Sequence, residues 1–309
     1  MCRLSLVRVG FATGLLLAAP FAFAAAPVPN DSQLKQGEYI YRAAGCETCH
    51  TDTKHAGKPL AGGHALVTPF GTFYTPNITP DKETGIGRWS EQDFTRAMRF
   101  GMSPDGDHYY PAFPYPSYTK LSDDDIRALW IYLKARPPIM QANRQHDLKW
   151  FARSRSLLGT WKRLYFTPGI YQPDASKSQA WNRGAYLAEA AAHCGECHTP
   201  RNTLGGIKIE QRYAGTREGP DGGVVPNITP DKKTGIGKWR ASELVDYLAT
   251  GLTPEGDSAG DLMAEVIDNG LKYLTKEDLA AIAEYVLSQP PVENSVRKPK
   301  KPGQKESFE

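Results

Sequence analysis

Apolar side chains recur at helical spacing in two segments that lie far apart in the chain. In residues 122–135 the apolar positions follow an i, i+3, i+4, i+7 pattern and are Ile126, Leu129, Trp130 and Leu133. Residues 275–288 repeat this pattern with Leu279, Ile282, Ala283 and Val286. Such spacing puts the apolar side chains on one face of an α-helix. We therefore predict a helix in each segment, with one face buried in a core.

Residues typical of helix starts mark further helices. Ser90 and Asp93 stand three positions apart, as do Ser122 and Asp125, which is the spacing of a capping box. We expect helices over residues 31–45, 90–100, 122–135, 178–193, 241–250 and 275–288. No run between them has the alternating pattern of a strand. The sequence therefore predicts an all-α fold in which long loops join the helices.

The second half of the chain repeats the first. Residues 76–89 recur as 226–239, and the copies differ only at the pairs Glu83/Lys233 and Arg88/Lys238. Residues 101–107 resemble 251–257 at the same offset. Segments repeated in the same order indicate two homologous units. We therefore predict two domains, over residues 32–135 and 178–290.

Each half holds one Cys-x-x-Cys-His motif. Four of the five cysteines lie in these motifs, whose residues are Cys46, Cys49, His50, Cys194, Cys197 and His198. The pattern is typical of c-type haem attachment, because two thiols bind the porphyrin edge while the adjacent imidazole binds the iron. A redox dithiol or half of a zinc site is the alternative for a single copy. Two copies inside a longer repeat favour two covalently attached haem c groups.

The first 24 residues have the layout of a secretory signal peptide. Arg3 and Arg8 precede an apolar run over 9–23, and small residues that fit a cleavage site after Ala24 follow. The run is shorter than the ~20 residues that a membrane-spanning helix needs. We therefore expect cleavage, loss of Cys2 with the signal, and export to the periplasm.

Charge and hydropathy exclude two classes of protein. The 309-residue chain has 37 Lys and Arg against 34 Asp and Glu, a formal net charge of +3. This near balance excludes a nucleic-acid-binding protein that relies on overall basicity. A mean hydropathy of −0.48, with 40% hydrophobic residues, excludes a polytopic membrane protein.

Aromatic and basic residues are concentrated in the linker over 136–177. They include Lys149, Trp150, Phe151, Arg153, Arg155, Trp161, Lys162, Arg163, Tyr165 and Phe166. So many aromatic side chains disfavour a flexible tether. We expect a helical strap over about 146–164 that packs across both domains, with a basic interaction surface as the alternative. The tail over 291–309 is polar and basic, which predicts disorder.

The two halves differ where a second iron ligand is expected. An iron held by His in an electron-transfer protein usually takes a further ligand, often Met. Met263 is the candidate for the second haem, and core packing is its alternative role. The residue 150 positions earlier is Phe113, which cannot bind iron. For the first haem we favour His108 on the same loop; Met102 or the lack of a protein ligand on that face are the alternatives.

Together these features resemble a known family. The paired Cys-x-x-Cys-His motifs, the duplicated Pro-Asn-Ile-Thr-Pro-Asp segments and the Pro-Ala-x-Pro-Tyr loop at 111–115 look like those of the multihaem cytochrome c subunits of bacterial alcohol, aldehyde and gluconate dehydrogenases. The resemblance covers about residues 32–290 and implies two tandem class I cytochrome c domains with long haem-wrapping loops. Family members usually carry three haems, so this chain is similar to a diheme relative. Their loop often has Met where Phe113 stands.

The resemblance implies electron transfer from a dehydrogenase to a quinone, another cytochrome or an oxidase of the respiratory chain. We expect a periplasmic carrier or electron-transfer subunit, not an enzyme, with no nucleic-acid partner. A peroxidase-like enzyme acting at the first haem is the alternative, and a ligand sensor, for which no output domain is evident, is the third hypothesis. Peripheral association with the inner membrane stays open, because the family's membrane-attachment segment is not evident in the basic tail.

Overall fold

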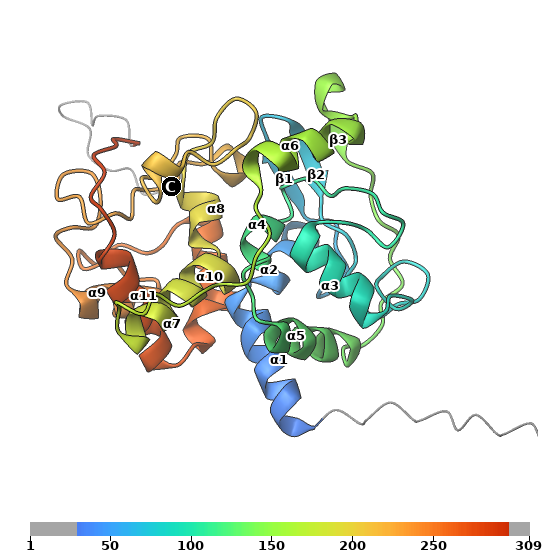
Figure 1. The fold of residues 1–309 in the computed structure, drawn as a ribbon, viewed down its shortest axis with the longest axis horizontal. Helices are drawn as coiled ribbons and strands as arrows, with labels where there is room; N and C mark the ends of the chain where they lie inside the picture. Colours follow the sequence, from blue (N-terminus) through green and yellow to red (C-terminus); the bar gives the residue numbers. More distant parts are fainter. Residues whose placement is uncertain (1–29, 297–309) are drawn as a thin grey trace, which may run out of the picture.

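The computed structural model describes residues 30–296, and Figure 1 shows how its helices and strands are arranged. The expected signal peptide lies outside the described residues, as does the tail from residue 297 onward. No helix within 30–296 is long and apolar enough to cross a membrane.

Five helices form the first half of the described chain. They are α1 (Asp31–Ala43), α2 (Cys46–His50), α3 (Glu91–Phe100), α4 (Tyr115–Tyr118) and α5 (Asp123–Lys134). Asn30 and Ser90 cap α1 and α3 in capping boxes, so the side chain three residues on returns a bond to the cap. α1 packs so closely on α5 that a Cβ on Gly37 would lie 2.1 Å from Ala128 O. Only glycine permits this approach.

The second half has a corresponding set of helices. They are α7 (Gln179–Tyr186), α8 (Cys194–His198), α9 (Ala241–Thr250), α10 (Asp261–Asn269) and α11 (Lys276–Leu287), and α7 continues as a π-helical turn over Leu187–Ala191. α7 packs on α11 as α1 packs on α5, and a Cβ on Gly184 would lie 1.9 Å from Ala281 O. The predicted helices are confirmed to within a few residues at their ends. The sequence analysis predicted none of the short helices α2, α4 and α8, nor α10.

A small sheet corrects the all-α expectation. Strands β1 (Ala65–Thr68), β2 (Gly71–Tyr74) and β3 (Asp147–Leu148) pair antiparallel in the order β1-β2-β3. Gly71, at φ 120°, leaves room for the backbone of β3, because a Cβ there would lie 2.4 Å from Asp147 O. Strands of two to four residues are too short to show an alternating pattern. The sequence therefore did not reveal them.

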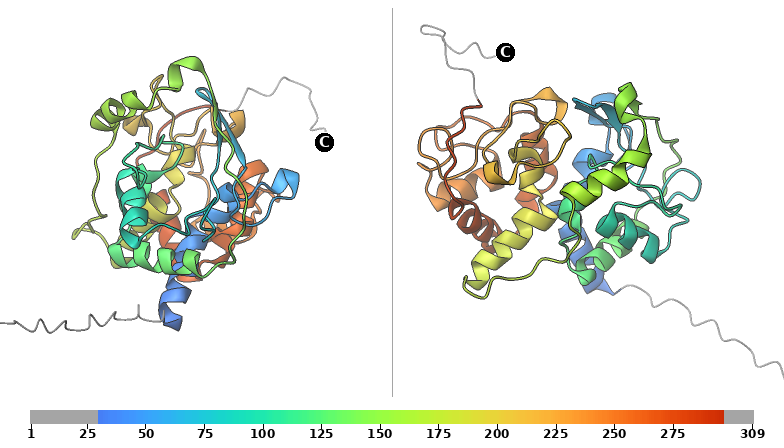
Figure 2. Two further views of the ribbon diagram at one scale, coloured as in Figure 1. Left: turned by 90° about the vertical axis from the view of Figure 1, so that its right-hand side faces the viewer. Right: turned by 45° about the horizontal axis from the view of Figure 1, so that its top comes forward.

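The strap between the halves is less helical than predicted. In place of one helix over 146–164, the chain forms β3, 3₁₀ turns at Trp150–Ala152 and Arg155–Leu157, and then α6 (Leu158–Tyr165). Pairing of β3 with β2 prevents the helix from starting earlier. Trp161 Nε1 donates to Leu204 O in the second half and Lys162 Nζ to Gly101 O in the first, each at 2.8 Å. The strap therefore contacts both halves, at one edge of the molecule in Figures 1 and 2.

Residues 291–296 are ordered, which corrects part of the expectation of a disordered tail. Thr229 Oγ1 accepts a hydrogen bond from the backbone N–H of Val292 at 3.2 Å. In the first half, Thr79 Oγ1 accepts from the N–H of Ile139 at 3.1 Å. The segment after the last helix of each half is thus fixed to the repeated Pro-Asn-Ile-Thr loop. The prediction of disorder did not take these side-chain-to-backbone hydrogen bonds into account.

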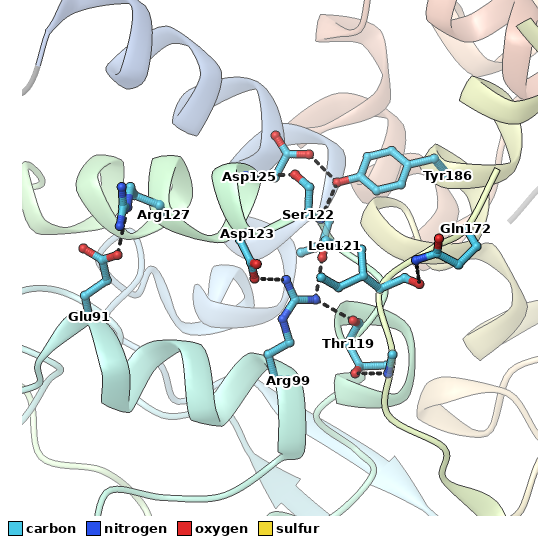
Figure 3. Close-up of polar contacts among 12 residues, drawn as sticks. Glu91, Arg99, Thr119, Leu121, Ser122, Asp123, Asp125, Arg127, Gln172 and Tyr186 are labelled. Atoms are coloured by element: carbon cyan, nitrogen blue, oxygen red, sulfur yellow. Dashed lines mark hydrogen bonds and ion pairs between the residues drawn. The ribbon is translucent and has the colours of Figure 1, made fainter. Parts of the chain in front are cut away.

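The two halves meet through reciprocal hydrogen bonds. Tyr186 of α7 donates its hydroxyl to Asp125 of α5, as Figure 3 shows, and Tyr39 of α1 donates to Asp278 of α11 at 2.5 Å. Each tyrosine oxygen also accepts from the backbone N–H of the residue that caps the opposite helix, at 3.1 and 3.2 Å. Since α1 corresponds to α7 and α5 to α11, exchanging the halves exchanges the two contacts. Buried apolar side chains of both halves also form one continuous core cluster.

The third member of each contact differs. Gln36 Nε2 donates to Asp125 at 2.6 Å, whereas Arg183 donates to both carboxylate oxygens of Asp278, at 2.9 and 2.7 Å. Burial raises the pKa of Asp278, but the hydrogen bonds from Arg183 and Tyr39 outweigh it and hold the pKa below its usual value. Only one of the two equivalent contacts is therefore an ion pair.

Candidate metal centres

The two Cys-x-x-Cys-His motifs form short helices of their own, α2 and α8. Gly45 precedes α2 with φ 59° and ψ 31°, and His193 precedes α8 with φ 40° and ψ 40°. This left-handed conformation turns the chain sharply into each motif; glycine adopts it freely, while a residue with a Cβ does so at a cost. Within each helix the two cysteines lie one turn apart and the histidine ends the helix.

A backbone carbonyl fixes the tautomer of the histidine in each motif. His50 Nδ1 lies 2.8 Å from Pro76 O, and His198 Nδ1 lies 2.9 Å from Pro226 O. Because a carbonyl only accepts hydrogen bonds, each Nδ1 carries the proton and each Nε2 keeps its lone pair for a metal. Burial lowers the pKa of His50 to about 4 and lowers the pKa of His198, so both imidazoles are neutral at pH 7.

None of the four motif cysteines is in a disulfide, and each of their thiols has a raised pKa. Burial is the main cause, and it raises the pKa to about 12 for Cys46 and Cys197 and to about 11 for Cys49 and Cys194. A redox dithiol needs a lowered thiol pKa, so these pairs do not fit that alternative. Within residues 30–296, no three His, Cys, Asp or Glu side chains cluster as a zinc site would require.

The remaining chemistry fits covalent haem c. Each motif offers two thiols for the porphyrin vinyl groups and one neutral imidazole whose Nε2 is free for the iron. A backbone carbonyl that accepts a hydrogen bond from Nδ1 is a common partner of metal-bound histidines and fixes the orientation of the ring. The same arrangement occurs twice, so each predicted site has both thiols and the histidine ligand that its haem requires.

The two motifs face each other across the junction between the halves. His193, just before Cys194, has Nε2 3.3 Å from Ala44 O, just before the turn into Cys46. The His193 ring also packs edge-on to Tyr118, with 5.4 Å between centroids. The pKa of Cys197 is raised by burial first and next by the nearby Cys49. The residues that would hold the two haems are therefore neighbours in space.

The predicted ligand Met263 lies in the first turn of α10, where the sequence analysis placed no helix. Its side chain is half-buried and packs on the common core. α10 contacts α9 of its own half and α2 of the other, and Thr48 Oγ1 donates to Glu265 O at 3.4 Å. The core role of Met263 is thus realised, while iron binding by its sulfur stays a prediction.

Aromatic rings surround the corresponding position of the first half. Phe113 packs against the core, and its ring centroid lies 5.8 Å from that of Tyr109 and 5.7 Å from that of Tyr118. None of these contacts provides the sulfur or imidazole ligand usual for this type of iron.

The two other candidates for the first iron make contacts of their own. His108 Nδ1 lies 3.1 Å from Lys162 Nζ, and its Nε2 faces Gly159 of α6, where a Cβ would lie 3.4 Å away. Met102 lines a surface pocket beside Phe100. Both of these residues lie where the sequence analysis left them as candidates, and the ligand of the first iron on this face stays a prediction.

Sequence reasoning missed two features around these sites. The carbonyls of Pro76 and Pro226 were not singled out, although a Pro-Asn-Ile-Thr segment follows each motif after a similar interval. The burial of Lys162 was also missed, because the predicted packing of the strap across both domains named no cation that would be buried. No local signal in the sequence distinguishes Lys162 from the exposed Arg163 beside it.

Comparisons with known proteins agree with this chemistry. The cytochrome c family profile matches residues 34–136. A diheme cytochrome c-type protein of Cereibacter sphaeroides is 40% identical over 303 residues, which cover 94% of this chain and 97% of that protein. The gluconate 2-dehydrogenase cytochrome c subunit of Pantoea cypripedii is 38% identical over 277 residues, covering 87% of this chain but 62% of that subunit. The cytochrome c subunit of the quinone-dependent alcohol dehydrogenase of Gluconobacter oxydans is 36% identical over 290 residues, covering 90% of this chain and 59% of that subunit.

Proposed function

Because the chain belongs to the family of diheme c-type cytochromes, we propose that it carries electrons in the periplasm from a dehydrogenase toward the respiratory chain. It binds two haem c groups covalently. We further propose that each half is a class I cytochrome c domain, in line with the repeated helices and motifs. The haems supply one-electron redox chemistry, and the chain supplies their attachment and surroundings.

The closeness of the two motifs is the observation that carries this proposal. Cys46, Cys49 and His50 would hold one haem, and Cys194, Cys197 and His198 the other. His193 and Ala44 join the two motifs by a contact of 3.3 Å, and the nearby Cys49 helps to raise the pKa of Cys197. A protein that only stored or sensed would not require two redox sites so near each other. Their proximity favours electron passage through the chain.

The two sites are proposed to differ in potential. Met263 is the proposed further ligand of the second iron, and a thioether ligand raises the potential. Phe113 stands at the equivalent place in the first half. His108 remains our proposed ligand there, with Met102 or no protein ligand as the alternatives. A bis-histidine iron has the lower potential of the two arrangements, which would give electrons a preferred order of occupation.

Names of the relatives support a dehydrogenase as the electron donor. Those that match this chain include cytochrome subunits of gluconate 2-dehydrogenase and of fructose dehydrogenase. This chain spans only 62% and 52% of these two subunits. The acceptor is proposed to be a quinone, another cytochrome or an oxidase, and the chain itself to catalyse no reaction.

Delivery of one electron to the diheme protein tests the proposal. A photoreductant present at less than one equivalent per chain would reduce one haem, and absorption at the haem bands would follow its redistribution. We expect a first-order redistribution whose rate constant does not change with protein concentration, because the haems share one chain. A rate that increases with protein concentration would show transfer between molecules and contradict the proposal.

Carbon monoxide binding separates this function from the second candidate, a haem enzyme acting at the first iron. The specific observation behind that candidate is Phe113, which cannot bind iron. We expect no carbon monoxide binding to the reduced protein. Tight binding at one haem, together with peroxide turnover, would favour the enzyme. Low-temperature paramagnetic resonance of His108→Ala and Met102→Ala would then assign the ligand.

A further inference from the structure

The strap around helix α6 buries a cation and leaves two leucines exposed, Leu157 just before the helix and Leu164 within it. Lys162 is 8% exposed, and its ammonium donates to Phe100 O at 2.5 Å and to Gly101 O at 2.8 Å. Leu157 and Leu164, two turns apart, are 62% and 65% exposed. A helix on the surface of a protein in water usually turns its apolar residues inward, as α6 does with Leu158, which is 7% exposed. Leu157 and Leu164 depart from this arrangement, so the side of the strap that carries them is better suited to an apolar neighbour than to water.

Further apolar side chains extend this face. Trp150, in the 3₁₀ turn before α6, is 82% exposed, and Phe151 beside it is also exposed. Phe151 packs edge-on against Phe70, which lies in the turn between β1 and β2, with 6.4 Å between the ring centroids. We call Trp150, Phe151, Leu157 and Leu164 the outer strap face. Exposed large apolar residues that gather on one surface commonly mark an interaction site.

Cations without acidic partners surround the outer strap face. They are Lys149, Arg153, Arg155 and Arg163, all exposed. Among the ion pairs of residues 30–296, none involves any of the four. Asp147 is the one acidic residue in the sequence 146–165. The face thus combines tryptophan, leucine and uncompensated positive charge.

We propose that the outer strap face binds the surface of a lipid bilayer that contains anionic lipids. Tryptophan and leucine side chains on a basic segment enter the boundary between headgroups and acyl chains, while lysine and arginine remain at the phosphate level. The strap turn projects at the edge of the molecule in each view of Figures 1 and 2, where a flat surface can reach it. A protein partner would instead need a hollow complementary to this convex turn.

Flotation of the diheme protein with vesicles tests the proposal, because haem absorption reports the bound fraction directly. The vesicles contain phosphatidylcholine alone or with phosphatidylglycerol. We expect binding to the anionic vesicles that weakens with added salt, since attraction between exposed charges is screened. The double variant Leu157→Ser/Leu164→Ser should bind at least about tenfold more weakly, because it removes two large apolar side chains from the contact.

Met140→Ser is the matched control, because Met140 is 79% exposed and lies outside the strap. It should bind like the parent protein, and all variants should keep the parent's haem spectrum, since the changed side chains are exposed. Equal binding by the double variant and the parent would overturn the proposal. Failure of the parent protein to bind anionic vesicles would also overturn the proposal. This holds even if light scattering then shows self-association, or if a dehydrogenase is found to bind through this face.

Discussion

Neutralising Asp278 should destabilise the folded chain more than neutralising the equivalent Asp125. In the change Asp278→Asn, three hydrogen bonds lose their charged acceptor, two from Arg183 and one from Tyr39. A hydrogen bond to a charged group contributes about 1.5–3 kcal/mol and a neutral one about 0.5–1.5 kcal/mol. Arg183 is 37% exposed and can regain water, so we expect a loss of about 2 kcal/mol in unfolding free energy, below the sum of the three differences.

Asp125→Asn is the control, because the side-chain donors to the Asp125 carboxylate are uncharged: Gln36 in its own half and Tyr186 in the other. We expect a smaller loss of about 1 kcal/mol there. Urea unfolding of both variants, followed by circular dichroism, gives the comparison. Equal losses in the two variants, or a larger loss in Asp125→Asn, would refute the reasoning.

The same ion pair has a predictable pH dependence. The folded-state pKa of Asp278 lies below its usual value, so its contribution to stability is present above the unfolded pKa of about 3.9 and is lost as pH falls through the lower folded value. The difference in unfolding free energy between the parent and Asp278→Asn should therefore shrink in acid. A difference that stays constant down to strongly acidic pH would contradict the assigned role.

Three further outcomes follow from the structure. Met263→Ala should open one iron per chain to carbon monoxide, and Met140→Ala should not; a reduced Met263→Ala protein that binds none would remove Met263 as a ligand. His193→Gly should keep the fold, because Gly45 stands at this place in the first motif, but should alter the mutual influence of the haems in a potentiometric titration through loss of the Ala44 contact. Burial lowers the pKa of Lys162 from 10.5 to about 8. Between these two pH values the unfolded chain binds one more proton than the folded chain, so the free energy of unfolding should rise as pH increases. Lys162→Met should abolish this rise when unfolding is measured as a function of pH.

Local patterns predicted the helices and both cysteine motifs well, because each depends on residues only a few positions apart. The capping residues Ser90 and Ser122 mark the starts of α3 and α5 as expected. The thiols and the histidine of each motif lie on one short helix, so their spacing in the sequence is enough to indicate haem attachment.

Contacts between distant residues could not be predicted from one sequence. Tyr39 and Asp278 are 239 positions apart, and nothing near either residue indicates the other. Lys162 is buried only because α6 packs on the loop around Gly101. The strands β1–β3 are likewise defined by their pairing and not by a pattern within any one of them.

The reciprocal tyrosine–aspartate contacts have the form of an isologous dimer interface, in which one surface patch meets its own copy. A single-haem ancestor with this patch would form a dimer with a second copy of itself, and the two haem sites of that dimer would be identical. Joining the copies through the strap makes their association independent of protein concentration. It also allows each half to change independently of the other. Two pairs of equivalent positions illustrate this, Gln36 with Arg183 and Phe113 with Met263. Gene fusion thereby permits two unequal redox sites, which a symmetric homodimer cannot have.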